Sequence, residues 1–438
     1  MSGVNKKRKA LLFAASAILF LLIGVEFYDQ SFLDGNSTFQ DLRYVNITLV
    51  AYLFSNKRIN QPFYVYFPIP FDAENQKLIS IKFSKEPDEL LQDEWNQSIA
   101  AFKISSMEPN ELIQISMSCI VKLVSLEYKI EPEKTGSIDD IPERIKQLYT
   151  KDEEMYKIHD PIIVSFTEEA LGGEKNIYKI VRRIHDYVIE RLSYKLDPRW
   201  DDAPTTLSKG EGSCSEYVFS FIALCRAAGV PARFVGGTVV DPGLSGMPIN
   251  VELTDYTFHR WAEVYVPNYG WLPVDVTYDD GVEGNEFFFR LTDTFFAFVR
   301  RGGASRYLGW NYLPVIDPRM EGIVLRARAF WIPIPEAQKA VLTISMVEES
   351  LSHLIGVVNS SDFMKIEDLL TMALLELEQG NFTRGLSLSQ HALSLVKELE
   401  ENHKRKEDKP MNFALIFALV LLLLGIFVVF LRRKGKFK

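Results

Sequence analysis

The sequence KGEGSCSEYVFSFIALCRAAGV, residues 209–230, predicts a buried helix with a cysteine at its start. Apolar residues recur at helical spacing after the cysteine. Ser213 and Glu216 form a capping box, which predicts Ser213 as the N-cap and Cys214 as the first helical residue. Gly229 marks the end of the helix. Backbone N–H groups and the helix dipole at such a start favour a thiolate, which is the nucleophilic form of cysteine.

A second pattern lies further along the chain, in FHRWAEVYVPNYGWLPVDVT, residues 258–277. Aromatic and β-branched residues alternate on both sides of a Pro-Asn-Tyr-Gly turn, which predicts a β-hairpin. His259 begins one strand and Asp275 lies near the end of the other, so both fall at the open end of the hairpin. A helix-tip cysteine facing this histidine and aspartate would supply a nucleophile, a base and a group that orients the base.

These motifs together resemble the transglutaminase-like superfamily. The resemblance rests on GxC opening a helix, then AAGVPARFVGG, HRWAEVYV and GWLPVDVT, and it covers roughly residues 177–277. It implies an α+β, papain-like transglutaminase core. It also implies Cys214 as the nucleophile, His259 as the base and Asp275 as the orienting acid, in the chain order of that family.

Other residues near these motifs receive weaker assignments. Trp200 and Tyr194 lie upstream of the cysteine and are the candidates for an oxyanion-hole side chain, for which the family motif gives no clear match. Cys225 and Cys119 lie in apolar stretches and are predicted to be core residues. His185 lies near the apolar face of a predicted amphipathic helix, so it is expected to be packed rather than catalytic.

No metal ion or cofactor is expected. Some transglutaminases use Ca²⁺, and an acidic turn, residues 278–283, follows the hairpin. Its spacing matches no EF-hand loop, so a solvated loop is predicted there.

Two apolar segments, residues 10–27 and 411–431, are predicted to be transmembrane helices. Basic tails, residues 1–9 and 432–438, flank them on their outer sides. By the positive-inside rule both tails are predicted to be cytoplasmic and everything between the segments to be extracellular. A cleavable signal peptide is the alternative for the first segment, but its exit offers no small-x-small site, so a retained anchor is predicted.

The remaining composition narrows the class of protein. The formal net charge is −9, and the two basic tails leave the middle of the chain more acidic still. Such a surface argues against a nucleic-acid partner, because phosphate binding needs basic patches. The three cysteines are too few for a disulfide framework.

Three regions are predicted between the membrane segments. Residues 28–133 alternate with period two and predict a β-sandwich-like domain. Residues 134–333 hold the transglutaminase-like catalytic domain, and Gly322 to Ile332 within it predicts one more strand. Residues 334–405 predict a C-terminal α-helical hairpin, with helices over 366–379 and 383–401.

The sequence thus favours a membrane-anchored extracellular thiol enzyme that acts on peptide or carboxamide bonds through a cysteine thioester. Water as acceptor gives a protease or amidase, and an amine gives a transamidase; both stay open, with hydrolysis slightly favoured. The expected partners are a protein or peptide substrate at the cell surface and the lipid bilayer. The competing hypothesis is a non-catalytic surface scaffold that uses the same fold.

Overall fold

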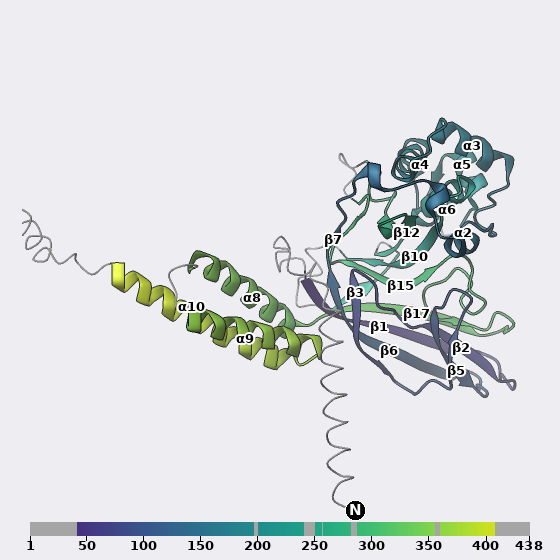
Figure 1. The fold of residues 1–438 in the computed structure, drawn as a ribbon. Coiled ribbons are helices and arrows are strands. Elements are labelled where there is room, and N and C mark those ends of the chain that lie inside the picture. The colour runs from purple at the N-terminus through teal and green to yellow at the C-terminus, as the bar shows by residue number, and fades with distance from the viewer. Residues whose placement is uncertain are drawn as a thin grey trace, which may run out of the picture. The chain divides into compact units, whose positions relative to one another are not determined.

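A computed structural model describes the chain between residues 42 and 407, with short gaps (Figure 1). The described ranges are 42–196, 200–240, 250–255, 257–281, 287–354 and 360–407. Both predicted membrane segments, 10–27 and 411–431, and their basic tails lie outside these ranges. Among the residues that are described, no helix combines the length and apolarity needed to cross a membrane.

Two sheets at the N-terminal end pack face to face. The first has the strand order β11-β17-β1-β6-β3, and the second the order β16-β2-β5-β4. The bounds of the first are β11 Val251–Leu253, β17 Val324–Pro333, β1 Leu42–Phe54, β6 Leu112–Val124 and β3 Gln76–Phe83. Those of the second are β16 Val315–Ile316, β2 Phe63–Pro68, β5 Ser98–Ile104 and β4 Glu89–Gln92.

The alternation of the sequence explains this packing. Along β1, Val45, Ile47 and Leu49 point to one face and are fully buried. The ring of Phe83 in the first sheet lies 5.8 Å from that of Phe102 in the second, in an edge-to-face contact. The two inner faces therefore form one shared core, as expected for a sandwich.

The strand predicted over Gly322 to Ile332 belongs to this sandwich. It is β17, and it pairs antiparallel with β1 from Val45↔Pro333 to Phe54↔Val324. The sandwich therefore combines strands from residues 42–104 and 112–124 with three later strands, β11, β16 and β17, which fall within the predicted range 134–333. β1 has apolar residues along its whole length and is covered on both edges, by β17 and β6.

The region that contains Cys214, His259 and Asp275 is a mixed helix and sheet core, which confirms the α+β prediction. Its antiparallel sheet has the order β13-β12-β10-β15. Helix α6, Cys214–Ala227, packs against β12 and β10 and is buried from Cys214 to Arg226. Three further helices pack around α6 (Figure 1). The strands are β10 Ala232–Val239, β12 Phe258–Val266, β13 Gly270–Val274 and β15 Phe295–Arg301, and the helices are α3 Pro161–Leu171, α4 Ile177–Arg191 and α5 Ala203–Lys209.

Smaller elements complete this region. The strand β8, Ser193–Tyr194, pairs parallel with β9, Glu211–Gly212, directly before α6. A second short pair, β7 Leu126–Glu127 with β14 Arg290–Leu291, links the end of the sandwich to the core. The helix α2 spans Glu143–Tyr149.

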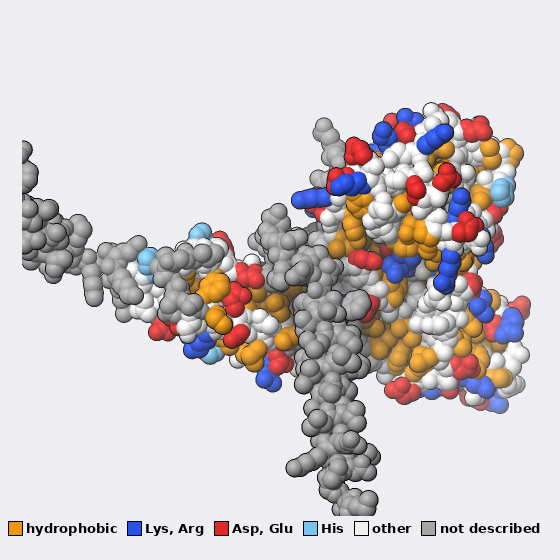
Figure 2. Space-filling view, viewed as in Figure 1, with side chains coloured by type: hydrophobic (Ala, Val, Ile, Leu, Met, Phe, Trp, Pro, Cys, Tyr) orange, Lys and Arg blue, Asp and Glu red, His pale blue; other side chains and the backbone are white. Residues whose placement is uncertain are grey.

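The C-terminal region contains three helices rather than a hairpin. The predicted pair corresponds to α9, Ser360–Glu378, and α10, Phe382–Glu407. A third helix, α8, Pro335–Leu354, packs against both. Two helices bury too little surface alone, and α8 supplies the missing apolar face. Hydrophobic side chains still show on the bundle surface (Figure 2), and Leu342 and Met364 are among its exposed apolar residues.

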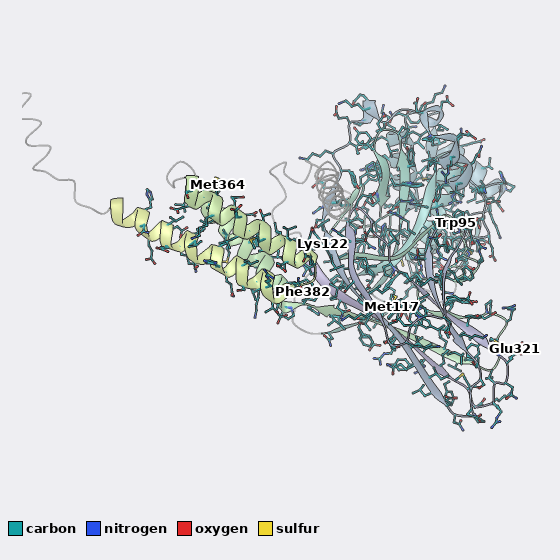
Figure 3. The ribbon with its side chains drawn as sticks, turned by 60° about the horizontal axis from the view of Figure 1, so that its bottom comes forward. Trp95, Met117, Lys122, Glu321, Met364 and Phe382 are labelled. Atoms are coloured by element: carbon teal, nitrogen blue, oxygen red, sulfur yellow. The ribbon has the colours of Figure 1, made fainter. Side chains whose placement is uncertain are left out.

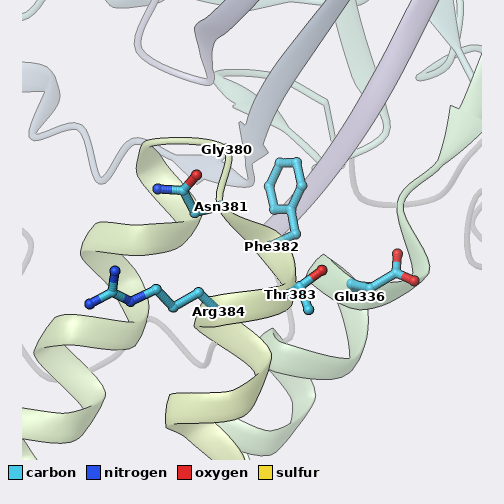
Figure 4. Close-up of a pocket in the computed structure, with 6 residues that line it drawn as sticks. All are labelled: Glu336, Gly380, Asn381, Phe382, Thr383 and Arg384. Atoms are coloured by element: carbon cyan, nitrogen blue, oxygen red, sulfur yellow. The ribbon is translucent and has the colours of Figure 1, made fainter.

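The turn between α9 and α10 fastens this bundle to the sandwich. Gly380 has a left-handed φ of 79°, as a helix C-cap requires. The ring of Phe382 lies 5.5 Å from that of Tyr44 on β1, and Lys122 on β6 forms an ion pair of 2.9 Å with Glu378 (Figures 3 and 4). The hollow in Figure 4 is lined by residues of α8, α10 and this turn, and none of the three predicted site residues lines it.

Candidate active site

Cys214 is the first residue of α6, as the capping box predicts. The Ser213 backbone N–H donates to Glu216 Oε2 at 2.9 Å, and the Asp201 N–H donates to Oε1 of the same carboxylate at 3.2 Å. Gly212 allows this close turn, since a Cβ there would lie 2.5 Å from the Cβ of Glu216. The Cys214 side chain lies almost buried at the helix N-terminus, with 5% of its surface exposed.

His259 and Asp275 meet at the open end of the predicted hairpin. The register of β12 and β13 runs from Val266↔Gly270 to Ala262↔Val274, so Asp275 directly follows the last paired residue. His259 Nε2 lies 2.5 Å from Asp275 Oδ2. The other carboxylate oxygen accepts the backbone N–H groups of Thr277 and Tyr278, each at 3.1 Å. Asp275 is fully buried, and its orientation is set by all three donors.

His259 and Cys214 lie close enough for each side chain to shift the pKa of the other. Because Nε2 faces Asp275, Nδ1 is the ring nitrogen left for the sulfur. Burial by itself would raise the pKa of the Cys214 thiol, but His259 and Arg260 bring that pKa below its usual value. Burial likewise opposes protonation of His259, yet Asp275 and Cys214 raise its pKa to about 10. These opposite shifts favour a thiolate–imidazolium pair.

Aromatic rings enclose the histidine. The ring centroids of Tyr278, Phe295 and Trp261 lie 4.6, 6.2 and 6.3 Å from that of His259. On the neighbouring strand β10, Gly237 pairs with His259. This apolar frame limits the ring to a narrow range of positions and keeps water from the His259–Asp275 contact.

Sequence analysis missed Arg260, which adjoins the histidine. Its side chain is 7% exposed, and Nη1 lies 4.0 Å from Cys214 Sγ. The guanidinium carbon lies 4.4 Å from the ring centroid of Trp200 and 4.6 Å from that of Tyr312. An arginine directly after the histidine, in a strand motif rich in apolar residues, HRWAEVYV, was the available signal.

The two oxyanion-hole candidates lie near the site in different ways. Trp200 forms one face of the Arg260 stack. Tyr194 is 52% exposed, and the charge of Cys214 adds to burial in raising its pKa. Within the described ranges, the side-chain hydrogen bond to the Cys214 sulfur comes from Arg260, and neither candidate makes one.

His185 is packed, as predicted, but it forms a second histidine–aspartate contact. Its Nε2 lies 2.9 Å from Asp279 Oδ2, and its Nδ1 lies 2.9 Å from Asp186 Oδ1. Asp279 also accepts the Phe287 N–H at 2.9 Å and is buried. The prediction of a solvated acidic turn is therefore wrong at Asp279, because the turn folds back onto α4.

The other two cysteines are core residues, as predicted. Cys119 lies inside the sandwich, and burial raises its thiol pKa to about 12. Cys225 lies on the buried side of α6, where burial raises the pKa well above the usual value. No cluster of three or more His, Cys, Asp and Glu side chains placed to hold a metal ion occurs in the described ranges.

Comparisons with known proteins point to one family. The model of the Transglutaminase-like superfamily matches residues 164–276. An uncharacterized protein of Haemophilus influenzae is 25% identical over 233 residues, which are 48% of this chain and 62% of that protein. A protein-glutamine gamma-glutamyltransferase of Pseudomonas aeruginosa is 39% identical over 69 residues, which are 15% of this chain and 10% of that protein. The chain thus spans less than two thirds of either relative.

One solved structure extends over more of the chain. The crystal structure of a proposed cysteine protease from Cytophaga hutchinsonii covers 66% of this chain and 92% of its own, at 15% identity and a TM-score of 0.46. The match of the family model covers the helix start, the hairpin and all three predicted site residues. Residues 164–276, which include Cys214, His259 and Asp275, are thus similar to the transglutaminase-like superfamily.

Proposed function

We propose that this protein is a thiol enzyme that transfers acyl groups from peptide or carboxamide bonds through a thioester on Cys214. The observation that carries the proposal is the chain of contacts from the helix-tip sulfur through His259 to the buried carboxylate of Asp275, at 2.5 Å. Asp275 raises the pKa of His259, and His259 lowers the pKa of Cys214. Both shifts have the direction that nucleophilic catalysis requires.

The proposed reaction has two halves. In the first, the Cys214 thiolate adds to the carbonyl carbon, and the protonated His259 gives its proton to the leaving nitrogen as the carbon–nitrogen bond breaks. In the second, neutral His259 takes a proton from the acceptor, which attacks the thioester and frees the sulfur. Asp275 holds the imidazole in the tautomer that points Nδ1 at the sulfur throughout.

The acceptor defines the activity. Water gives a protease or amidase, whereas a primary amine gives a transamidase. The 39% identical relative from Pseudomonas aeruginosa is a protein-glutamine gamma-glutamyltransferase, which favours testing an amine acceptor beside water. A glutamine-containing protein mixture with a fluorescent primary amine separates the two, since transamidation attaches the amine and hydrolysis releases ammonia without it.

The proposal includes a location. The apolar segments at residues 10–27 and 411–431 anchor the protein in the membrane, the tails are cytoplasmic, and the region between them acts on protein or peptide substrates at the cell surface. This part rests on the sequence pattern alone.

The decisive experiment is labelling of the full chain with an acylating thiol probe, such as a peptide thioester or p-nitrophenyl acetate. Wild type is expected to acquire one acyl group, and Cys214→Ala none. Cys225→Ala is the matched control because it removes a second thiol from the same helix. If Cys214→Ala is acylated as fast as wild type, the site is idle, and the non-catalytic scaffold becomes the better description.

A further inference from the structure

Arg260 differs from the other buried arginines of the chain. Arg233 pairs with Glu263 at 2.6 Å, and Arg226 and Arg301 donate to backbone carbonyls. In the described ranges Arg260 has neither a carboxylate partner nor a carbonyl acceptor, and its one hydrogen bond goes to the Cys214 sulfur. Its Nε is buried without a partner, as is that of Arg301, but both Nη atoms of Arg301 donate to carbonyls. Burying a cation without an anionic partner costs free energy. The unpaired charge of Arg260 therefore indicates a functional role and not a stabilising one.

Two aromatic faces hold this side chain and fix its direction. The guanidinium lies over Trp200 at 4.4 Å and over Tyr312 at 4.6 Å. Such cation–π contacts stabilise a guanidinium without neutralising it. With its plane fixed in this way, Nη1 is aimed at the sulfur of Cys214, 4.0 Å away.

We propose that Arg260 is a catalytic residue that stabilises the negative charge of the reaction, first on the Cys214 sulfur and then on the oxyanion of the tetrahedral intermediate. The inference rests on the proposed thiol chemistry and names a residue that the family motif did not supply. It assigns the oxyanion position to the Arg260 side of the sulfur, where Trp200 stacks on the guanidinium.

The charges balance along this path. Before attack, the negative charge sits on sulfur. The sulfur lone pair then forms the bond to the carbonyl carbon, and the carbonyl π pair moves onto oxygen, which becomes the anion. When that pair returns, the carbon–nitrogen bond breaks and the leaving nitrogen takes the proton of His259. The negative charge therefore moves from sulfur to oxygen and is never far from the same guanidinium.

The geometry allows one group to serve both positions. The oxyanion is two bonds from the sulfur, so it lies closer to the sulfur than the 4.0 Å that separates Nη1 from Sγ. A donor in this position can reach an oxyanion at about 3 Å, the distance at which oxyanion-hole donors act. Since the guanidinium is already fixed by its rings, little reorganisation accompanies the transfer of charge.

The test compares two reactions of the same thiol in the full chain. Alkylation by iodoacetamide forms no oxyanion and reports on the thiolate alone, whereas acylation by p-nitrophenyl acetate passes through one. Both rates are measured against pH, so that they are compared where Cys214 is fully ionised in each variant. Among the described residues, the titratable or charged groups that interact with the Cys214 thiol are His259, Arg260, Tyr194 and Tyr312.

For Arg260→Gln we expect acylation to fall by about 10² to 10³, while alkylation stays within a few-fold of wild type. Arg260→Lys keeps the positive charge but not the planar guanidinium, so its acylation rate should fall less than that of Arg260→Gln. Arg233→Gln is the matched control, because it removes a buried arginine that stacks on Trp271 at 3.8 Å and lies four positions along β10 from the partner of His259. Its ratio of acylation to alkylation should equal that of wild type.

Two results would overturn the inference. A pH midpoint that rises while the ratio of acylation to alkylation stays at the wild-type value would mean that Arg260 only adjusts the thiolate, and an unchanged midpoint and ratio would mean that it only packs. If Arg260→Gln does not fold by circular dichroism, Arg260→Lys carries the same comparison, with a smaller but selective fall in acylation expected. Failure of Cys214 to react at all would instead contradict the proposed function, so the two failures are distinct.

Discussion

The Cys214 sulfur lies beside two cationic side chains, whereas the other two thiols lie in apolar surroundings. His259 and Arg260 lower the pKa of the Cys214 thiol, while burial raises those of Cys119 and Cys225. We therefore expect iodoacetamide at neutral pH to modify Cys214 well before the other two in the folded protein. Mass spectrometry of tryptic peptides at successive times measures the order. Preferential labelling of Cys225, or equal labelling of all three, would contradict the proposed site.

The carboxylate of Asp275 supplies both orientation and charge to His259. Asparagine is nearly the same size and can still accept the N–H groups of Thr277 and Tyr278, so Asp275→Asn should fold. Turnover should fall by about 10 to 10³, less than the loss of about 10⁴ reported for the corresponding change in a Ser-His-Asp enzyme, because a thiolate is already a good nucleophile. The measurement is the acylation rate, with circular dichroism as the folding control. Full activity in Asp275→Asn would make this residue an ordinary strand-end aspartate.

The opposite pKa shifts of the thiol and the imidazole predict a broad pH profile. Turnover needs the thiolate and the protonated imidazole together. It should rise with pH through the lowered pKa of Cys214, and fall as His259 loses its proton near pH 10. Since the charge of Asp275 helps to raise the pKa of His259, Asp275→Asn should move the alkaline limb to lower pH while the acid limb moves less. An alkaline limb that does not move would contradict this role of the carboxylate.

At the scale of elements, the contact between His185 and Asp279 fastens α4 to the turn that follows β13. Both side chains are fully buried. His185→Gln leaves the Asp279 carboxylate without its charged partner and should lower the free energy of unfolding by about 3 kcal/mol. Asp186→Asn is the control, since Asp186 contacts the same imidazole but its side chain is 45% exposed. Urea denaturation measures the free energy of unfolding of both variants. Equal losses would mean that the buried contact with Asp279 stabilises the fold no more than the exposed contact with Asp186.

The pH dependence of this stabilisation has a definite sign. The contacts with Asp186 and Asp279 outweigh burial and raise the pKa of His185 above its usual value of about 6.5. Because the pKa of His185 is higher in the folded state, its contribution to the free energy of unfolding is fully present below the pKa of the unfolded state. That contribution is lost as the pH rises through the pKa of the folded state. The difference in unfolding free energy between wild type and His185→Gln should therefore be largest in acid and shrink towards alkaline pH. A difference that grows with pH would contradict protonation of His185.

The sheet beneath the site depends on the absence of a side chain at Gly237. A Cβ there would lie 2.0 Å from the carbonyl oxygen of Phe296 on β15 and 2.9 Å from the ring of Trp261. The backbone of β15 cannot yield cheaply, so Gly237→Ala should lower the free energy of unfolding by about 1 to 3 kcal/mol. Because Gly237 pairs with His259, the acylation rate should fall as well. Wild-type stability and rate in Gly237→Ala would show that the two strands are free to separate.

At the scale of the whole molecule, sandwich, core and helical bundle are joined by β17, which crosses the sandwich and leads directly into α8. The proposed membrane topology places all three outside the cell. Protease treatment of intact cells should therefore trim the region between residues 28 and 410 and spare tags fused to either end. N-terminal sequencing of the mature protein that begins after Val25 would contradict a retained first anchor.

Much of the transglutaminase-like core follows from short-range pattern. The capping box placed Cys214 at a helix start, and alternation in FHRWAEVYVPNYGWLPVDVT placed His259 and Asp275 at the open end of a hairpin. The capping box reflects backbone hydrogen bonding, and the alternation shows which face of a strand is apolar. Both depend only on residues that are close in sequence. The sequence by itself therefore determined which residues could meet.

Contacts between segments far apart in the chain came only from the tertiary structure. β17 pairs with β1, which lies some 270 residues earlier in the chain; Leu53↔Leu325 is one of the paired positions. Arg260 reaches the sulfur of Cys214 because two rings from separate segments hold it there, and Asp279 is buried against His185 rather than solvated. No local pattern encodes such neighbours, since each depends on how several elements pack at once and on which buried charge finds a partner.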